Sequence, residues 1–196
     1  MNPTGFPLFP LHAVLVPGAT LQLRIFEPRY LDMVRDCCRD GTGFGVCAIL
    51  DGEEAGKPAT PAAVGCEARV VDFTTLPDGL LGITARGGRR FSTQRTRVLD
   101  SGLIVAEVAW LEEDPRTALA IEHELLATLL RRCLEQLGGE YARAGAMAYA
   151  DAAWVSWRLA EWLPVGLQER QRLLETSDPN MRMQHLLELV ARLQPD

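Results

Sequence analysis

Side chains that commonly carry catalysis or bind metals are few in this 196-residue chain, and they do not form a recognisable set. The three histidines, His12, His123 and His185, lie in different parts of the chain and show no metal-ligand spacing. The only lysine, Lys57, lies in a polar stretch where nothing indicates a partner serine. No phosphate-binding motif of the type G-x-x-x-x-G-K-[ST] is present. We therefore expect no enzyme activity, no metal site and no cofactor.

Glu27 and Arg29 lie on either side of Pro28 and could act as an acid–base pair. The same residues are also typical of the start of a helix, where a carboxylate accepts hydrogen bonds from the first free amides. We prefer this structural interpretation, because carboxylates at the start of helices are common. It predicts that Glu27 caps a helix and that Arg29 pairs with a nearby acid or carbonyl.

A cluster of arginines is the one feature that could contact phosphate groups. The cluster occupies two predicted neighbouring strands, with Phe91 among its members: Arg86, Arg89, Arg90, Arg95 and Arg97. RNA binding through these strands is therefore an alternative function. The formal net charge of −6 opposes long-range attraction to nucleic acid, and it favours a solvated strand face instead.

The elements that position these residues begin with two predicted strands. Prolines interrupt the apolar residues 6–16, and a proline cannot donate a ladder hydrogen bond. The pattern therefore predicts a kinked strand at a sheet edge or barrel rim. After a turn at Pro17-Gly18, residues 20–26 alternate between apolar and polar, which is typical of a half-buried strand.

A helix is predicted to begin at Pro28, to bury Tyr30 and to end at Gly41. Three segments of this region carry a family resemblance: Phe6-Pro7-Leu8-Phe9-Pro10-Leu11, Val14-Leu15-Val16-Pro17-Gly18 and Ile25-Phe26-Glu27-Pro28-Arg29-Tyr30. The order of strand, turn, strand and helix start resembles the substrate-binding (N-terminal) domain of Lon-type ATP-dependent proteases. The chain is most similar to bacterial proteins that carry this domain alone.

The remainder of the first half is rich in short apolar segments separated by turn signals. Strands are predicted at 43–50, 65–75, 80–86, 89–98 and 103–111, with an exposed loop at 51–61. Short strands, tight turns and one early helix are typical of a small closed or nearly closed barrel. The pattern becomes helical at 112–115, so we place a β-barrel subdomain at 1–113 and a helical bundle subdomain at 114–196.

The second half contains several predicted helices. An apolar stripe on the first of them consists of Leu126, Leu129, Leu130, Cys133 and Leu137. Further helices are expected at 147–163 and 167–175, and Asp178 is expected to cap a last helix that starts at Pro179. Within 147–163, Ala148, Ala152, Val155, Leu159 and Trp162 define one face, and Trp154 and Trp157 lie on the opposite half.

The C-terminal part shares the family resemblance. Its segments are Trp157-Arg158-Leu159-Ala160-Glu161-Trp162-Leu163-Pro164-Val165 and Gln171-Arg172-Leu173-Leu174-Glu175-Thr176-Ser177-Asp178. The resemblance therefore spans nearly the whole chain. It implies an α+β fold, in which a PUA-like β-barrel with one early helix is followed by a C-terminal helical bundle. It also implies a non-catalytic module that recognises unfolded or exposed polypeptide segments, or a protein partner.

Six residues are candidates for contact with such a partner, in an apolar cleft between barrel and bundle or on the barrel rim near residues 26–30. They are Phe26, Glu27, Arg29, Tyr30, Trp154 and Trp157. The two tryptophans could instead pack inside the protein. Neighbouring alanines on the same half of the helix are small and allow another element to approach closely. Packing predicts a large loss of stability on truncation, and docking predicts a loss of binding.

Composition places the chain among soluble globular proteins, with 47% hydrophobic and 23% charged residues. No apolar run is long enough to span a membrane, and the first ten residues do not resemble a signal peptide. Five cysteines, an odd number without framework spacing, favour reduced thiols and a cytoplasmic location. We expect no membrane association and, given the negative net charge, no dedicated nucleic-acid binding.

Overall fold

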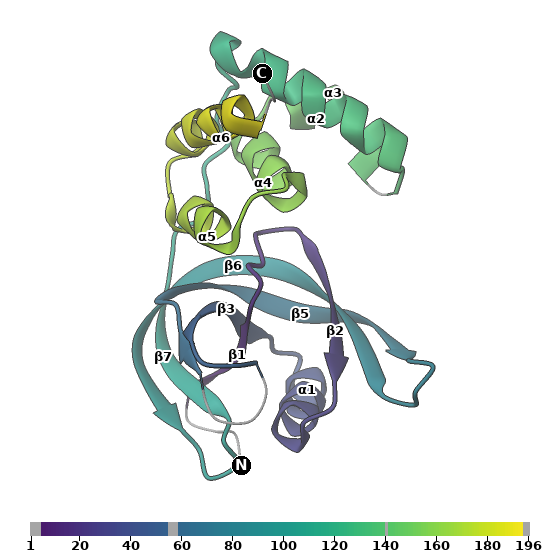
Figure 1. The fold of residues 1–196 in the computed structure, drawn as a ribbon, viewed down its shortest axis with the longest axis vertical. Coiled ribbons are helices and arrows are strands. Elements are labelled where there is room, and N and C mark those ends of the chain that lie inside the picture. Colours follow the sequence, from purple (N-terminus) through teal and green to yellow (C-terminus); the bar gives the residue numbers. More distant parts are fainter. Residues whose placement is uncertain (1–4, 55–58, 140, 194–196) are drawn as a thin grey trace. The chain divides into compact units, whose positions relative to one another are not determined.

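A computed structural model of the chain describes residues 5–54, 59–139 and 141–193 (Figure 1). The fold is mixed α/β, with one main sheet and several helices. The chain divides into two compact units, Met1–Glu113 and Asp114–Asp196, and we treat each unit by itself. All strands that the structure describes lie in unit 1, together with one helix.

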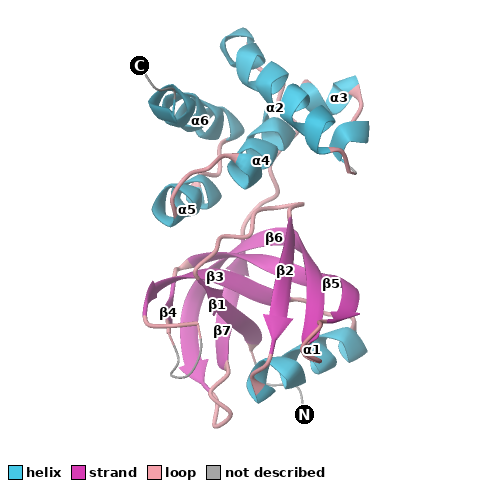
Figure 2. Ribbon diagram, turned by 45° about the vertical axis from the view of Figure 1, so that its right-hand side comes forward, coloured by secondary structure: helices cyan, strands magenta, loops and turns pink. Residues whose placement is uncertain are grey.

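Unit 1 is organised by a sheet whose path of paired strands returns to its start. Its elements are β1 (Phe6–Leu11), β2 (Thr20–Ile25), α1 (Pro28–Asp40), β3 (Phe44–Asp51), β4 (Thr60–Pro61), β5 (Val64–Thr75), β6 (Leu81–Val98) and β7 (Ile104–Trp110). The pairing runs β1-β7-β6-β5-β3, and β3 then pairs with β1 in parallel (Figure 2). β2 is attached to β6, and β4 to β3. The interior is apolar, since buried Leu8, Cys47, Phe91 and Ile104 from four strands of this ring pack together.

β1 does not lie at a sheet edge, which was one of the two positions that its prolines predicted. It pairs with β7 over residues 6–8 and with β3 over residues 8–11. Pro7 lies in the first of these segments and Pro10 in the second. A proline cannot donate a hydrogen bond to a neighbouring strand. Because each half of β1 is paired with a different neighbour, the proline in each half affects the pairing with only one strand, and β1 tolerates both prolines.

β6 is a single strand, although two strands at 80–86 and 89–98 were predicted. The Gly87-Gly88 pair does not interrupt it, and the amide of Gly87 donates to the carbonyl of Ala19. A Cβ at Gly87 would collide with the carbonyl oxygen of Val16. The glycine therefore marks the close approach of another backbone rather than a turn.

α1 begins and ends where the sequence predicted. Pro28 is in its first turn, and Gly41 ends it in the left-handed conformation with φ 65°. Tyr30 is buried and stacks on Phe9, with ring centroids 4.0 Å apart. Glu27, however, makes no capping hydrogen bond with its side chain. That part of the prediction is wrong because the carboxylate is engaged by Arg29 instead.

Unit 2 contains five α-helices within the residues described. They are α2 (Glu124–Leu137), α3 (Ala146–Tyr149), α4 (Ala152–Trp162), α5 (Leu167–Glu175) and α6 (Pro179–Leu193), with short 3-10 turns at η1 (Ile121–His123) and η2 (Tyr141–Arg143). The prediction for α5 is confirmed, and the Asp178 carboxylate accepts from the amide of Asn180 at the start of α6. No helix among the described residues is long and apolar enough to cross a membrane.

Two helix predictions in unit 2 are wrong in detail. The helix expected at 147–163 is divided, because Asp151 caps α4 by accepting from the amide of Ala153, and the same carboxylate accepts from the amide of Thr117. Trp162, which was assigned to the packed face of that helix, is 45% exposed. On α2, the buried side chains are Leu126, Ala127, Leu130 and Leu134. Leu129, Cys133 and Leu137 of the predicted stripe are exposed.

Candidate functional site

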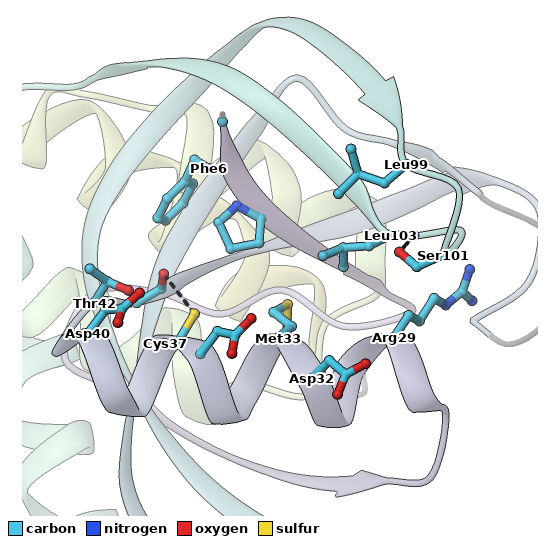
Figure 3. Close-up of a pocket in the computed structure, with 14 residues that line it drawn as sticks. Phe6, Arg29, Asp32, Met33, Cys37, Asp40, Thr42, Leu99, Ser101 and Leu103 are labelled. Atoms are coloured by element: carbon cyan, nitrogen blue, oxygen red, sulfur yellow. Dashed lines mark hydrogen bonds between the residues drawn. The ribbon is translucent and has the colours of Figure 1, made fainter. Parts of the chain in front are cut away.

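Unit 1 has a groove along α1, which we call the α1 groove. It has a volume of about 340 Å³ and lies between α1, the start of β1 and the turn between β6 and β7. Figure 3 shows Asp32, Met33, Cys37 and Asp40 projecting from one side of α1, with Phe6, Leu99 and Leu103 above them. The apolar lining consists chiefly of Phe6, Pro7, Met33, Leu99 and Leu103. An apolar groove with a few polar groups is suited to binding a ligand side chain.

Three aspartates form the acidic rim of the groove. Asp32, Asp36 and Asp40 are spaced four residues apart, so they lie along one side of α1. Each carboxylate pairs with Arg35 or Arg39, at 2.7 Å for Asp32–Arg35 and at 3.0 Å for both Asp36–Arg39 and Asp40–Arg39. Side chains of both arginines are more than half exposed. Exposed pairs of this kind contribute little to stability because solvent screens them, so a cation of a ligand can compete for the carboxylates.

Arg29 fixes one end of the groove. Its guanidinium binds the Glu27 carboxylate at 2.9 Å, donates to the carbonyl of Gly102 at 3.0 Å and lies over the ring of Tyr30. The side chain is buried, and its Nε has no hydrogen-bond partner among the residues described. Gly102 belongs to the β6–β7 turn that carries Leu99 and Leu103. Arg29 therefore joins the start of α1 to the opposite wall, and the predicted pairing of Arg29 with an acid or carbonyl is confirmed.

Cys37, at the floor of the groove, is not arranged for covalent chemistry. Its thiol donates to the carbonyl of Gly43 at 3.4 Å. Burial raises the pKa of this thiol above its usual value, an effect that a hydrogen bond from Thr42 only partly opposes. A thiol with a raised pKa remains protonated at neutral pH and is a poor nucleophile. Cys37 therefore gives the groove no activated thiol.

A second pocket lies at the start of α1 and contains three of the predicted site residues. It has a volume of about 330 Å³, and its lining includes Phe26, Glu27, Tyr30 and Glu54. Phe26 is 53% exposed, whereas Tyr30 is buried. Burial raises the pKa of Tyr30, and the carboxylates of Glu27 and Glu54 raise it further against the opposing effect of Arg29. Of these residues, Phe26 presents the largest accessible apolar side chain.

The structure places the two remaining predicted site residues in unit 2. Trp157 is buried, and the guanidinium of Arg182 lies 3.5 Å from the centre of its ring. Trp154 is partly buried and meets Tyr149 edge-to-face at 5.0 Å. Both positions favour packing over docking for these tryptophans.

Sequence and structure comparisons identify the family. The model of the ATP-dependent protease La (LON) substrate-binding domain matches residues 5–192. The chain belongs to this LON domain family. The resemblance predicted from the N-terminal and C-terminal segments is thereby confirmed.

Curated relatives of this LON domain are longer proteins. Lon protease of Anaeromyxobacter dehalogenans (strain 2CP-C) is 26% identical over 201 residues, which cover 97% of this chain and 23% of the relative. Lon protease 2 of Myxococcus xanthus is 26% identical over 204 residues, which cover 97% of this chain and 24% of the relative. The chain thus spans about a quarter of the length of these relatives.

Solved structures share the LON domain fold. The crystal structure of a Lon N-terminal domain protein from Xanthomonas campestris is 50% identical, with a TM-score of 0.79, and covers 94% of this chain and 98% of that chain. The N-terminal domain of Mycobacterium avium complex Lon protease is 15% identical, with a TM-score of 0.65 and coverage of 94% and 97%. This second likeness concerns the fold alone.

The arginine cluster of this LON domain differs from the prediction. All five arginines lie on the single strand β6, not on two strands. Arg90 is buried, and Arg89 lies over the ring of Trp110 with Glu113 3.9 Å away. Arg90 is therefore withdrawn from solvent, whereas Arg86, Arg89, Arg95 and Arg97 are exposed.

The histidines considered as metal ligands lie in different elements: His12 between β1 and β2, His123 on η1 and His185 on α6. His123 is buried, and the ring of His185 lies 3.2 Å from the carboxylate of Glu169. In the part of the chain that the structure describes, no three histidine, cysteine or acidic side chains are grouped to hold a metal ion. Lys57 lies outside the described residues.

Sequence reasoning missed the acidic rim and the opposite wall of the α1 groove. The signal for the rim was present, because aspartates recur every four residues from Asp32 to Asp40. Leu99 and Leu103 gave no comparable signal. They reach the groove only because the β6–β7 turn folds back beside α1, which is a tertiary contact.

Proposed function

We propose that the chain is a recognition module that binds exposed apolar segments of other polypeptides in the α1 groove. Membership of the LON substrate-binding domain family supports recognition of substrates in general. The observation that carries the proposal is an apolar groove of about 340 Å³ edged by three aspartates. Phe26, with Glu27 and Tyr30 around its pocket, offers a second contact just before the start of the same helix.

The chemistry of the groove selects among polypeptide segments. Phe6, Leu99 and Leu103 would contact one or two apolar side chains, and burial of such groups is worth roughly 25 cal/mol per Å². The carboxylates of Asp36 and Asp40 would attract lysine or arginine residues beside that apolar centre. We therefore propose a preference for apolar segments flanked by basic residues.

Fluorescence anisotropy with two labelled peptides tests the proposal. Both carry the same centre of leucine and phenylalanine, flanked by lysines in one peptide and by glutamates in the other. Replacing Asp32, Asp36 and Asp40 together by asparagine is expected to weaken binding of the lysine peptide about 5- to 30-fold, which corresponds to about 1–2 kcal/mol. Binding of the glutamate peptide should not weaken.

A second variant tests the apolar part of the groove. Leu99→Glu is expected to weaken both peptides, whereas Leu50→Glu, at a 67% exposed leucine outside the groove, serves as the control. Failure of the wild-type chain to bind either peptide would refute the proposed function. Wild-type affinity in both groove variants would refute the proposed site.

We further propose that the chain is not an enzyme and acts in the cytoplasm. Support comes from the protonated, buried Cys37 and from the five cysteines, all of which are free thiols. Purified protein should hydrolyse neither ATP nor casein, and turnover that persists through repurification would contradict this. The closed strand pairing of unit 1 supports description of its fold as a PUA-like barrel.

A further inference from the structure

An apolar stripe on the outer face of η1 and α2 has no partner within the residues described. The stripe consists of every fourth residue: Ile121, Leu125, Leu129, Cys133 and Leu137. Ile121 is 82% exposed and Leu125 is 74% exposed. Both views show α2 on the far side of α4 from α5 (Figures 1 and 2). α2 therefore has two apolar sides, one packed in unit 2 and one facing solvent.

We propose that this stripe is the contact surface for a second copy of the chain, paired antiparallel about a two-fold axis. Residues four apart form one of the side-chain ridges through which helices pack into each other's grooves. A two-fold contact requires a surface that complements itself. The proposal does not depend on the function of the α1 groove, which lies in unit 1.

The sequence of α2 meets the requirement for self-complementarity. When Leu125 of one copy faces Leu129 of the other, η1 with Ile121 runs toward the part of the other α2 that carries Cys133. That arrangement also brings Glu122 of η1 toward Arg132 of the other copy's α2, and both side chains are exposed. A parallel pair in register would instead set Glu122 against itself and Arg132 against itself. Charge therefore favours the antiparallel pair.

The expected dimer is weak. One pair of helices buries less surface than the 1,200 Å² or so that is typical of stable complexes. A net charge of −6 on each copy also opposes association. Dimerisation should therefore depend on protein concentration and should be strengthened by moderate salt.

Sedimentation velocity of the whole chain across a range of concentrations measures this equilibrium. Leu125→Asp is expected to raise the dimer dissociation constant at least tenfold. Met181→Asp is the matched control, because Met181 is 62% exposed in the same unit but lies on α6. A chain that stays monomeric at about 1 mM, the weak end of specific binding, would overturn the proposal. A dimer indifferent to Leu125→Asp would overturn it as well.

Charge exchange tests the antiparallel direction. Glu122→Arg alone and Arg132→Glu alone should each weaken the dimer, since each creates a like-charged pair across the contact. The double variant restores the opposite charges and should return association to near the wild-type level. If the double variant is weaker than both single variants, the antiparallel pairing is wrong.

Cross-linking through the native thiol of Cys133 gives an independent test. In a Cys38→Ser background, Ile121→Cys should form a disulfide-linked dimer with Cys133 under mild oxidation. Thr128→Cys, exposed on another side of α2, should link far more slowly. Equal rates for the two variants would overturn the predicted register.

Discussion

Arg182 is expected to be the side chain on which unit 2 depends most. It is fully buried on α6, and its guanidinium forms a salt bridge with Asp114 at the start of the unit. It also donates to the hydroxyl of Ser156 at 2.9 Å and to the carbonyl of Thr176 at 2.6 Å. The ring of Trp157 lies against its other side. One charged side chain thus joins α6, α4, the end of α5 and the first residue of the unit.

Removing either member of the buried pair leaves the other charge without its partner. Asp114→Asn and Arg182→Met should therefore each lower the free energy of unfolding by about 3–5 kcal/mol. Part of the cost of Arg182→Met, about 2 kcal/mol, comes from the lost contact with the Trp157 ring. The double variant leaves no isolated charge, so its cost should fall short of the sum of the single costs by about 2–3 kcal/mol.

Urea denaturation followed by tryptophan fluorescence and circular dichroism measures all three variants. Glu188→Gln on the exposed side of α6 is the control and should change the free energy of unfolding by less than about 0.5 kcal/mol. A cost below about 1 kcal/mol for Arg182→Met would show that the charge is solvated rather than buried. Strictly additive single costs would show that Asp114 and Arg182 do not interact.

Further predictions concern single buried side chains. Tyr30→Ala should cost about 3–5 kcal/mol because it removes a buried ring stacked on the core, and an unchanged melting temperature would contradict this. Trp157→Ala should cost a similar amount and Trp154→Ala less than half of it, so equal losses would show that burial does not decide the cost. Burial raises the pKa of the Cys47 thiol from 9.0 to about 12, so the folded state retains a proton that the unfolded state loses. Stability should therefore fall between pH 9 and 12, and Cys47→Ala should flatten that decline in urea melts recorded at successive pH values.

Local signals in the sequence were strong enough to predict most element boundaries. α1 is confirmed from Pro28 to Gly41, because a proline in the first turn and a glycine beyond the last are backbone requirements. The start of α6 follows from the Asp178 cap in the same way. Such features depend on a few neighbouring residues, and the rest of the fold does not alter them.

Predictions failed where tertiary contacts decide the outcome. Gly87 is a turn signal by itself, yet in the structure it admits the backbone of Val16 beside an uninterrupted strand. Pro7 and Pro10 indicate an edge, yet β1 is paired on both sides because its two neighbours use different halves. The α1 groove was missed for the same reason, since Leu103 joins it from a distant turn.

α2 shows why an apolar pattern cannot by itself separate packing from binding. Along this helix, apolar residues four positions apart form two rows. One row is Leu126, Leu130 and Leu134, and the other includes Leu125 and Leu129. Both rows satisfy the periodicity of an amphipathic helix. The stripe predicted from the sequence combined Leu126 and Leu130 of the first row with Leu129 of the second. Only the fold shows that the first row is buried in unit 2 and that the second row faces solvent. The exposed apolar row is what the proposed dimer would cover, and the charges of Glu122 on η1 and Arg132 on α2 suit a second copy of the same surface.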